Sequence, residues 1–368
     1  MTAMWNRRRI LKAAGAGAVA SNFPRSSLGK TLSGSGTVVV YDGGGAWGDA
    51  KRKAYFEPFE KETGIKVVPQ PRSAAGVLRA SVLAGAPKYD VFSMTGGTMY
   101  SFAAEKLLLP IDYGWWEAAD RAAIEPVPAL PYGVPSVYYS LMMAYANEAF
   151  TNKAPRSWAD FWDVNNFPGQ RALAPGATGS QGGTFEAALL ADGVAVERLY
   201  PLDWDRAFKS LSRIRPSIVK WWASGAEPVQ LLMDKQVSAA SAWNGRVSSA
   251  KDQGAKITGV WNQGVLQWDS WVVPKGASNV ENAMKFIAFV SRPESQARFV
   301  EAILYGPTNV KAFDHLKRER IELLPTAPPL RAQQVVQDYS WWGAVGANGE
   351  TNEKRAIVEW EKWITGGR

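Results

Sequence analysis

Apolar runs and amphipathic segments alternate along the first quarter of the chain. Short runs rich in β-branched residues at 37–41, 65–70 and 89–93 predict strands. The segments between them, 49–63 and 76–83, carry the apolar spacing of helices, and Gly64 is expected to end the first one in a left-handed conformation. This β-α-β-α-β order predicts an α/β fold in which helices flank a parallel or mixed sheet.

The predicted strands of this region end in glycine and polar residues. Ligands of such sheets bind outside the carboxyl ends of the strands, so we expect Asp42, Trp47 and Thr95 at a cleft. The glycines at 43, 45 and 48 match a dinucleotide-binding pattern, but no acidic residue follows the second strand to hold a ribose. The loop is therefore either an anion-binding turn at a helix start or a plain tight turn.

The pattern changes after residue 128. A strand-rich stretch at 130–150 predicts a crossover into a second lobe, and Ser157 is expected to cap a short helix. Further amphipathic segments predict helices at 203–214, 228–235, on both sides of Arg292-Pro293, and at 354–364.

The stretch 240–276 combines two turns with two short β-branched runs. One turn contains Trp243, and the other contains Trp268 and Asp269. An aromatic face attracts an organic cation and a carboxylate pairs with it, so these residues predict a cation pocket. The alternative is that the tryptophans belong to the core and that Asp269 caps a turn.

Composition limits the chemistry. The chain of 368 residues contains no cysteine and one histidine, His315, so disulfides, thiol nucleophiles and histidine metal clusters are excluded. The adjacent Tyr138 and Tyr139 suggest ferric iron only weakly, because neighbouring strand residues face opposite ways. We predict no cofactor and no metal. No basic stripe with interleaved aromatic residues is present, so no nucleic-acid partner is expected.

The amino terminus resembles a twin-arginine export signal. Arg7-Arg8-Arg9 and Lys12 precede a weakly apolar run and a small-residue cleavage site that ends at Ala20. An ordinary secretory signal is the alternative. We therefore expect residues 1–20 to be removed on export to the periplasm, and residues 21–36 to form a leader.

A set of motifs in fixed order extends over the whole mature chain: VVVYDGGG, FEKETGIKVV, YDVFSM, LPYGVP, SWADFW, SAWNGR, WDSWVVPKGASN and SWWGAVGANGE. The set resembles the extracytoplasmic solute-binding proteins of ABC importers, in particular the spermidine/putrescine-binding branch. The resemblance implies a type II periplasmic binding fold, with one lobe from 37–143 and 268–322 and the other from 144–267 and 323–368. It also implies a hinge that closes the lobes on a small solute, a monomeric state, and delivery to a membrane permease with a cytoplasmic ATPase.

The resemblance assigns roles to individual residues. Trp243 occupies a stacking position, Asp269 matches a carboxylate that binds an amine, and Tyr305 matches an aromatic wall. Gln267 replaces a further tryptophan of the family, and Trp268 lies beside it.

Two departures change the predicted ligand. The loop at 175–184 contains no Asp or Glu where the second acidic pair of polyamine binders belongs. Arg246 replaces a small polar residue beside the stacking tryptophan and either binds an acidic group or is a surface or inter-lobe arginine. The function predicted is capture of a small amine-bearing solute, a polyamine or a related zwitterion. An exported hydrolase with a tryptophan-lined cleft is the alternative, but no convincing carboxylate pair is present, so no enzyme is predicted.

Overall fold

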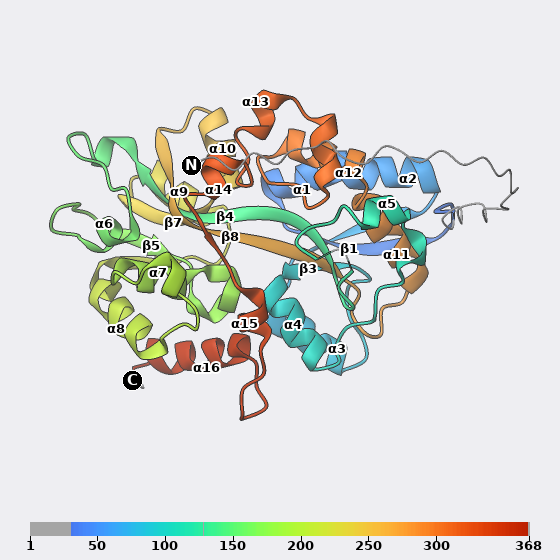
Figure 1. Cartoon of the computed structure of the whole chain (residues 1–368), viewed down its shortest axis with the longest axis horizontal. Coiled ribbons are helices and arrows are strands. Elements are labelled where there is room, and N and C mark those ends of the chain that lie inside the picture. The colour runs from blue at the N-terminus through green and yellow to red at the C-terminus, as the bar shows by residue number, and fades with distance from the viewer. Residues whose placement is uncertain (1–30, 128, 367–368) are drawn as a thin grey trace, which may run out of the picture.

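The computed structural model describes residues 31–127 and 129–366. The predicted signal peptide and residues 21–30 of the predicted leader lie outside the described residues. The chain forms two α/β lobes, and two long strands run from one lobe into the other (Figure 1). The residues directly before the first strand belong to the first lobe, because Leu32 is buried and the Gly34 amide donates to the Thr63 carbonyl at 2.9 Å.

The first lobe is built on β1 (Thr37–Asp42), which pairs in parallel with β2 (Lys66–Pro71). A bridge between Val40 and Val91 joins β1 to the chain leading into β3 (Phe92–Thr95). β3 pairs antiparallel with the last part of β8 (Ile257–Val272). The helices of this lobe are α1 (Gly45–Lys51), α2 (Glu57–Thr63), α3 (Ala75–Leu83), α4 (Gly96–Ala104), α5 (Ala118–Arg121), α11 (Val280–Val290) and α12 (Pro293–Ala302).

A π-helical turn over Arg52–Phe56 joins α1 to α2. The helix expected at 49–63 therefore starts earlier and contains this turn, but it ends as predicted, at Gly64 with a φ of 79°. The two helices expected around Arg292-Pro293 are confirmed as α11 and α12, with Pro293 at the first position of α12.

The second lobe has β5 (Arg171–Leu173) between β6 (Ile218–Trp221) and β7 (Ala239–Trp243), all parallel. Its helices are α6 (Trp158–Trp162), α7 (Thr184–Ala191), α8 (Trp204–Ile214), α9 (Glu227–Met233) and α10 (Asn244–Asp252). The Ser157 hydroxyl accepts from the Asp160 amide at 3.2 Å, so the predicted cap of α6 is confirmed.

The two lobes are joined through β4 (Val134–Ala146) and β8, which are antiparallel to each other. The first half of β4 pairs with the end of β8 in the first lobe, and the second half pairs with β7 and the start of β8 in the second. The register shifts between Leu141 and Met143, and Gln263 on β8 has a φ of 61°. The two β-branched runs expected around residue 260 are thus one long strand with an irregularity where it passes between lobes.

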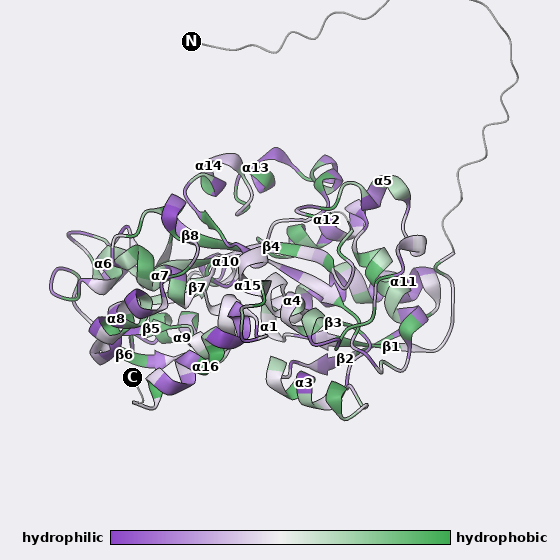
Figure 2. Cartoon of the chain, turned by 60° about the horizontal axis from the view of Figure 1, so that its bottom comes forward, coloured by the Kyte–Doolittle hydropathy of each residue, from purple (hydrophilic) through white to green (hydrophobic). Residues whose placement is uncertain are grey.

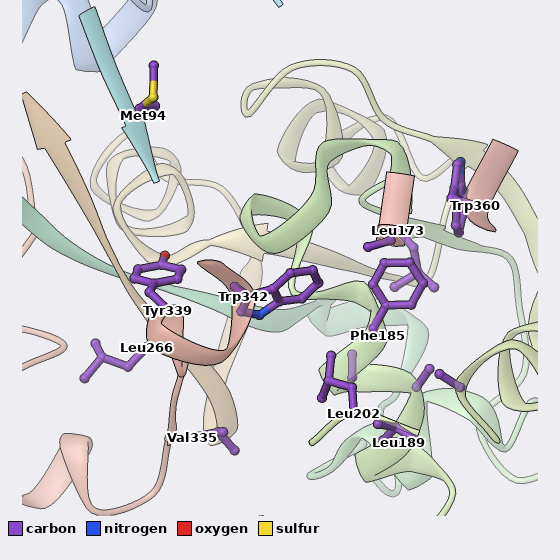
Figure 3. Close-up of a cluster of buried hydrophobic side chains, with 14 of the residues drawn as sticks. Met94, Leu173, Phe185, Leu189, Leu202, Leu266, Val335, Tyr339, Trp342 and Trp360 are labelled. Atoms are coloured by element: carbon purple, nitrogen blue, oxygen red, sulfur yellow. The ribbon is translucent and has the colours of Figure 1, made fainter. Parts of the chain in front are cut away.

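The carboxyl-terminal part lies along both lobes. It contains α13 (Arg318–Ile321), α14 (Pro328–Arg331), β9 (Val335–Val336), α15 (Tyr339–Gly343) and the amphipathic α16 (Asn352–Ile364). Figure 2 shows that α16 carries both hydrophobic and hydrophilic residues. Trp342 and Trp360 from this part pack around Phe185 of α7 (Figure 3). Burial of each such ring contributes about 2 kcal/mol, so this core fixes α16 to the second lobe, beside α4 of the first.

In the described part of the chain, no helix combines the length and the apolar character needed to cross a membrane.

Candidate ligand-binding cleft

A cavity of about 540 Å³ lies between the lobes. It is bounded on the first-lobe side by residues that follow β1, β2 and β3, and on the second-lobe side by residues that follow β6 and β7. These are the carboxyl ends of the strands, where α/β sheets place their ligands. The wall includes Tyr41, Gly43, Trp47, Arg72, Arg79, Thr95, Thr98, Tyr139, Thr178, Gln181, Trp222, Gly225, Trp243, Arg246, Asp269, Tyr305 and Glu353.

Asp269 is the carboxylate at the centre of this wall. Asp269 lies on β8 opposite Thr95 of β3 and is 7% exposed. Its oxygens accept hydrogen bonds from the Tyr139 hydroxyl at 2.6 Å and the Ser93 hydroxyl at 3.1 Å. Burial raises the pKa of Asp269, while the Tyr139 hydrogen bond opposes that rise. No ion pair among residues 31–127 and 129–366 includes Asp269, and the groups that bond it directly are neutral. Arg72 and Lys51 act on it only from a distance, so the carboxylate would gain from a cation in direct contact.

Aromatic rings surround Asp269 on both lobes. Tyr305 lies edge-on to Trp47, with ring centroids 5.2 Å apart, and to Tyr139 at 6.1 Å. Tyr139 is in turn edge-on to Trp243 at 6.2 Å. Ring faces next to a buried carboxylate form the environment that an organic ammonium group prefers.

Two guanidinium groups face the same cavity from opposite lobes. Arg72, which follows β2, donates to the Gln181 side-chain oxygen at 2.7 Å, and Arg246 of α10 donates to the Gly44 carbonyl at 3.3 Å. Neither belongs to an ion pair within the part of the chain that the structure describes, whereas Arg79 is paired through two hydrogen bonds with Glu105. Each guanidinium has five N–H donors, so Arg72 and Arg246 keep donors for an anionic group.

Charges of both signs therefore act inside one cavity. Burial raises the pKa of Tyr41; Arg72 and Arg246 lower it, while Asp269 raises it further. Burial also raises the pKa of Tyr305, which Arg246 lowers and Asp269 raises further. A carboxylate and guanidinium groups thus act on the same two hydroxyl groups, as expected of a site for a ligand with two opposite charges.

A family model for bacterial extracellular solute-binding proteins matches residues 54–356. The chain belongs to this family. The solute-binding protein is 36% identical to the gamma-aminobutyric acid-binding protein of Pseudomonas aeruginosa, over 84% of this chain and 87% of that one. It is 24% identical to the spermidine/putrescine-binding periplasmic protein of Escherichia coli, over 84% and 88% of the two chains. The predicted resemblance is confirmed.

Solved structures give the same result. An ABC transporter substrate-binding protein from Bradyrhizobium japonicum USDA 110 is 38% identical, with a TM-score of 0.79 over 89% of this chain and 99% of that one. A binding protein from A. tumefaciens R10 in complex with agropinic acid is 30% identical, with a TM-score of 0.80 over 90% and 99%. The protein is thus a solute-binding component of an ABC transporter with the periplasmic binding fold, and not an enzyme.

Relatives of equal sequence identity differ in how closely they superpose on this structure. A binding protein of Agrobacterium tumefaciens C58 in an open unliganded conformation is likewise 30% identical and is matched over 89% of this chain and 99% of that one, but its TM-score is only 0.59. The agropinic acid complex has the same identity and a TM-score of 0.80. In this chain, hydrogen bonds from Arg72 to Gln181 and from Arg246 to Gly44 link the two lobes, so the lobes are in contact across the cavity, an arrangement called closed.

The structure brings six of the nine predicted site residues to the cavity: Trp47, Thr95, Trp243, Arg246, Asp269 and Tyr305. Asp42, Gln267 and Trp268 are not part of its wall.

The three residues outside the wall have structural contacts instead. Asp42 accepts from the Gly44 amide at 2.9 Å and lies 3.7 Å from Arg52. Trp268 lies on the face of β8 opposite Asp269, and its ring packs edge-on against Tyr339 at 4.9 Å.

Gln267 is fully buried and donates to the Ser180 carbonyl at 2.7 Å. It therefore orders the Gly176–Gly182 segment, which contributes Thr178 and Gln181 to the wall.

Tyr41, Arg72, Tyr139 and Glu353 are among the wall residues that were not predicted as ligand contacts. Tyr41 and Arg72 stand at the ends of β1 and β2, so the strand-end rule would have found them. Tyr139 was considered only for iron, and no group of three or more His, Cys, Asp or Glu residues within the described chain is arranged to hold a metal. Glu353 comes from the first turn of α16, and no motif in its surroundings indicates the cleft.

Proposed function

We propose that this solute-binding protein captures a small zwitterion with a primary amine at one end and an acidic group at the other, such as an ω-amino acid. The ammonium group pairs with Asp269 inside the aromatic wall, and the acidic group lies between Arg72 and Arg246. The observation that supports this most strongly is the coexistence in one cavity of a buried carboxylate and two guanidinium groups that have no acidic partner among the described residues. The γ-aminobutyric acid-binding relative supports the same chemistry.

A polyamine is the second candidate, because relatives at 24% identity bind spermidine and putrescine. A long polyamine would place its other ammonium groups near Arg72 and Arg246, where like charges repel. Glu353 adds a second carboxylate to the wall, but its oxygens already accept from the Thr98 hydroxyl at 2.7 Å and the Ser180 amide at 2.9 Å. The charges of the cavity therefore favour the zwitterion.

The wider role follows from the family. Proteins of this family bind small solutes and work with a permease. We infer that this protein is exported through a twin-arginine signal, acts in the periplasm as a monomer, and supplies a permease driven by a cytoplasmic ATPase.

Isothermal titration calorimetry on the chain from Ser21 tests the proposal. The ligands are 4-aminobutyrate, butane-1,4-diamine, spermidine, butylamine and butyrate. We expect 4-aminobutyrate to bind at least about 100-fold more tightly than any compound that lacks one of its charges, because loss of one partner from a buried pair costs about 3 kcal/mol. Tighter binding of the diamine or of spermidine would contradict the proposal and favour a polyamine as the solute.

Single variants assign the two ends. Asp269→Asn should reduce the affinity for 4-aminobutyrate about 100-fold and also weaken butylamine, and Arg246→Gln should selectively weaken compounds that carry a carboxylate. Asp234→Asn is the matched control, because this exposed carboxylate accepts from Gln230 on the surface of the second lobe. Equal losses for Asp269→Asn and Asp234→Asn would rule out the assignment of Asp269.

A further inference from the structure

A cluster of four buried polar residues, three of which line the cavity, connects the two lobes. We call Thr95, Thr98, Ser180 and Glu353 the closure cluster. The Thr95 and Ser180 hydroxyl oxygens are 3.0 Å apart, and Thr95 and Thr98 are joined by a hydrogen bond of 3.0 Å. Glu353 accepts from the Thr98 hydroxyl with one oxygen and from the Ser180 amide with the other. All four residues are at most 9% exposed.

The members of the cluster come from three distant parts of the chain. Thr95 ends β3 and caps α4, in which Thr98 stands in the first turn. Ser180 belongs to the Gly176–Gly182 segment of the second lobe, and Glu353 to the first turn of α16, which is capped by Thr351. Thr95 and Thr98 thus belong to the first lobe, whereas the core around Phe185 fixes Glu353 to the second.

Glycines make this approach possible. A Cβ atom at Gly97 would lie 2.5 Å from the Ser180 hydroxyl oxygen and 3.0 Å from a Glu353 oxygen. A Cβ atom at Gly179, whose φ is 58°, would lie 2.5 Å from the other Glu353 oxygen. A side chain at Gly97 would thus displace groups of the opposite lobe, and one at Gly179 would displace the Glu353 carboxylate within the second lobe.

Two glutamine side chains hold the Gly176–Gly182 segment, which contains Ser180, in place. The Ser180 carbonyl accepts from the side-chain amides of Gln267 and Gln337, each at 2.7 Å. Three polar groups of Ser180, its amide, its carbonyl and its hydroxyl, are therefore bonded in the closed form, two of them within the second-lobe side and the third to Thr95. The hydroxyl is the one of these three groups whose hydrogen bond, to Thr95, crosses from the second lobe to the first.

We propose that Glu353 is a positioning residue for solute binding, which holds the lobes closed by joining Thr98 of the first lobe to Ser180 of the second. The proposal rests on the proposed function, because the cluster closes over the cavity assigned to the solute. Closure removes the Glu353 carboxylate from water, and that cost is offset only when both donors are in place. The carboxyl-terminal helix therefore stabilises the closed state and slows release of the solute, while the solute contacts set its specificity.

Single-molecule fluorescence energy transfer tests this. The chain has no cysteine, so Val77→Cys on α3 and Met233→Cys on α9, both exposed, give two labelling positions on opposite lobes. In this background we compare Glu353→Met and Ser180→Ala with the unmodified pair, in 4-aminobutyrate at a saturating concentration. Ser180 does not line the cavity, so its variant leaves the solute contacts in place. Ser291→Ala is the matched control, because that buried hydroxyl bonds the Ile287 carbonyl within the first lobe.

We expect the opening rate to rise roughly tenfold in Glu353→Met and about fivefold in Ser180→Ala, with an unchanged closing rate and no effect of Ser291→Ala. Opening rates within about twofold of the control for both variants, or changes confined to the closing rate, would overturn the proposal. If 4-aminobutyrate fails to close the lobes, the proposed function fails separately. The same comparison is then made on the closed dwells of the ligand-free molecules, where equal dwell times would overturn the role of Glu353.

Discussion

At the scale of single residues, the cleft combines a buried carboxylate, Asp269, with an exposed Arg72 and a half-buried Arg246. Asp269 has hydrogen bonds from Tyr139 and Ser93 but forms no ion pair with any described residue, and the hydrogen-bond partners of Arg72 and Arg246 are neutral. Folding has thus already removed the Asp269 carboxylate from water. A zwitterion that supplies the missing charges can convert the cost of that removal into affinity, because the pairs form in a preorganised site.

The raised pKa of Asp269 predicts how binding depends on pH. The protonated side chain is neutral and cannot pair with an ammonium group, so affinity is lost as the pH falls through the raised pKa of Asp269. The loss begins at a higher pH than for an ordinary aspartate. Calorimetric titration with 4-aminobutyrate from about pH 8 to about pH 4 measures it. Asp269→Asn should remove this component, and an identical profile in the variant would contradict the assignment.

Lys51 carries a separate pH dependence in stability. It is fully buried, donates to the Tyr41 carbonyl at 2.6 Å, and lies over the rings of Tyr41 and Trp271. Burial lowers the pKa of Lys51 to about 7. The unfolded chain therefore holds more protons than the folded one between pH 7 and the ordinary lysine pKa, and the free energy of unfolding rises with pH across that window.

Urea unfolding at a series of pH values checks this prediction. The contribution of Lys51 should approach a rise of about 1.4 kcal/mol per pH unit above the lowered pKa. Lys51→Met removes the titrating group and should remove the slope, whereas Lys53→Met alters an exposed lysine of the same region and should keep it. A slope that survives in Lys51→Met would show that another group is responsible.

At the scale of elements, close backbone approaches set the shape of the cavity. A Cβ atom at Gly225 would lie 2.4 Å from the Trp243 ring. Gly225→Ala should displace that ring, with a cost of about 1–3 kcal/mol, and weaken binding of 4-aminobutyrate roughly tenfold or more. Gly76→Ala is the control, because Gly76 also lines the cavity but has no atom within 4 Å of an added Cβ. Equal affinities of the two variants would contradict the assigned role of Trp243.

The helices and strands also show which parts of the fold sequence patterns can predict. Apolar periodicity located β1, β2 and α3, because each of these has one face in the core. It divided β8 into two runs, since the polar residues near Gln263 interrupt the pattern where the strand passes between lobes. Local patterns report burial within one lobe and do not record a strand shared by two.

At the scale of the whole molecule, the cleft joins segments that are far apart in sequence. Trp243, Asp269 and Tyr305 were predicted from a resemblance and line the cavity, as does Arg246. Gln267 was expected to contact the ligand but supports the Ser180 segment from behind. Glu353 gave no signal, because only the packing of α16 against the second lobe brings it to Ser180 and Thr98. Contacts of this kind depend on the assembled fold.

The orientation of the solute in the closed cleft is the central claim. A crystal structure of the mature chain with 4-aminobutyrate tests it most directly. We predict the ammonium nitrogen within hydrogen-bonding distance of an Asp269 oxygen and the carboxylate bound by Arg72, Arg246 or both. The closure cluster should be intact around Glu353. A ligand bound in the reverse direction, or density for the carboxylate away from both arginines, would contradict the account.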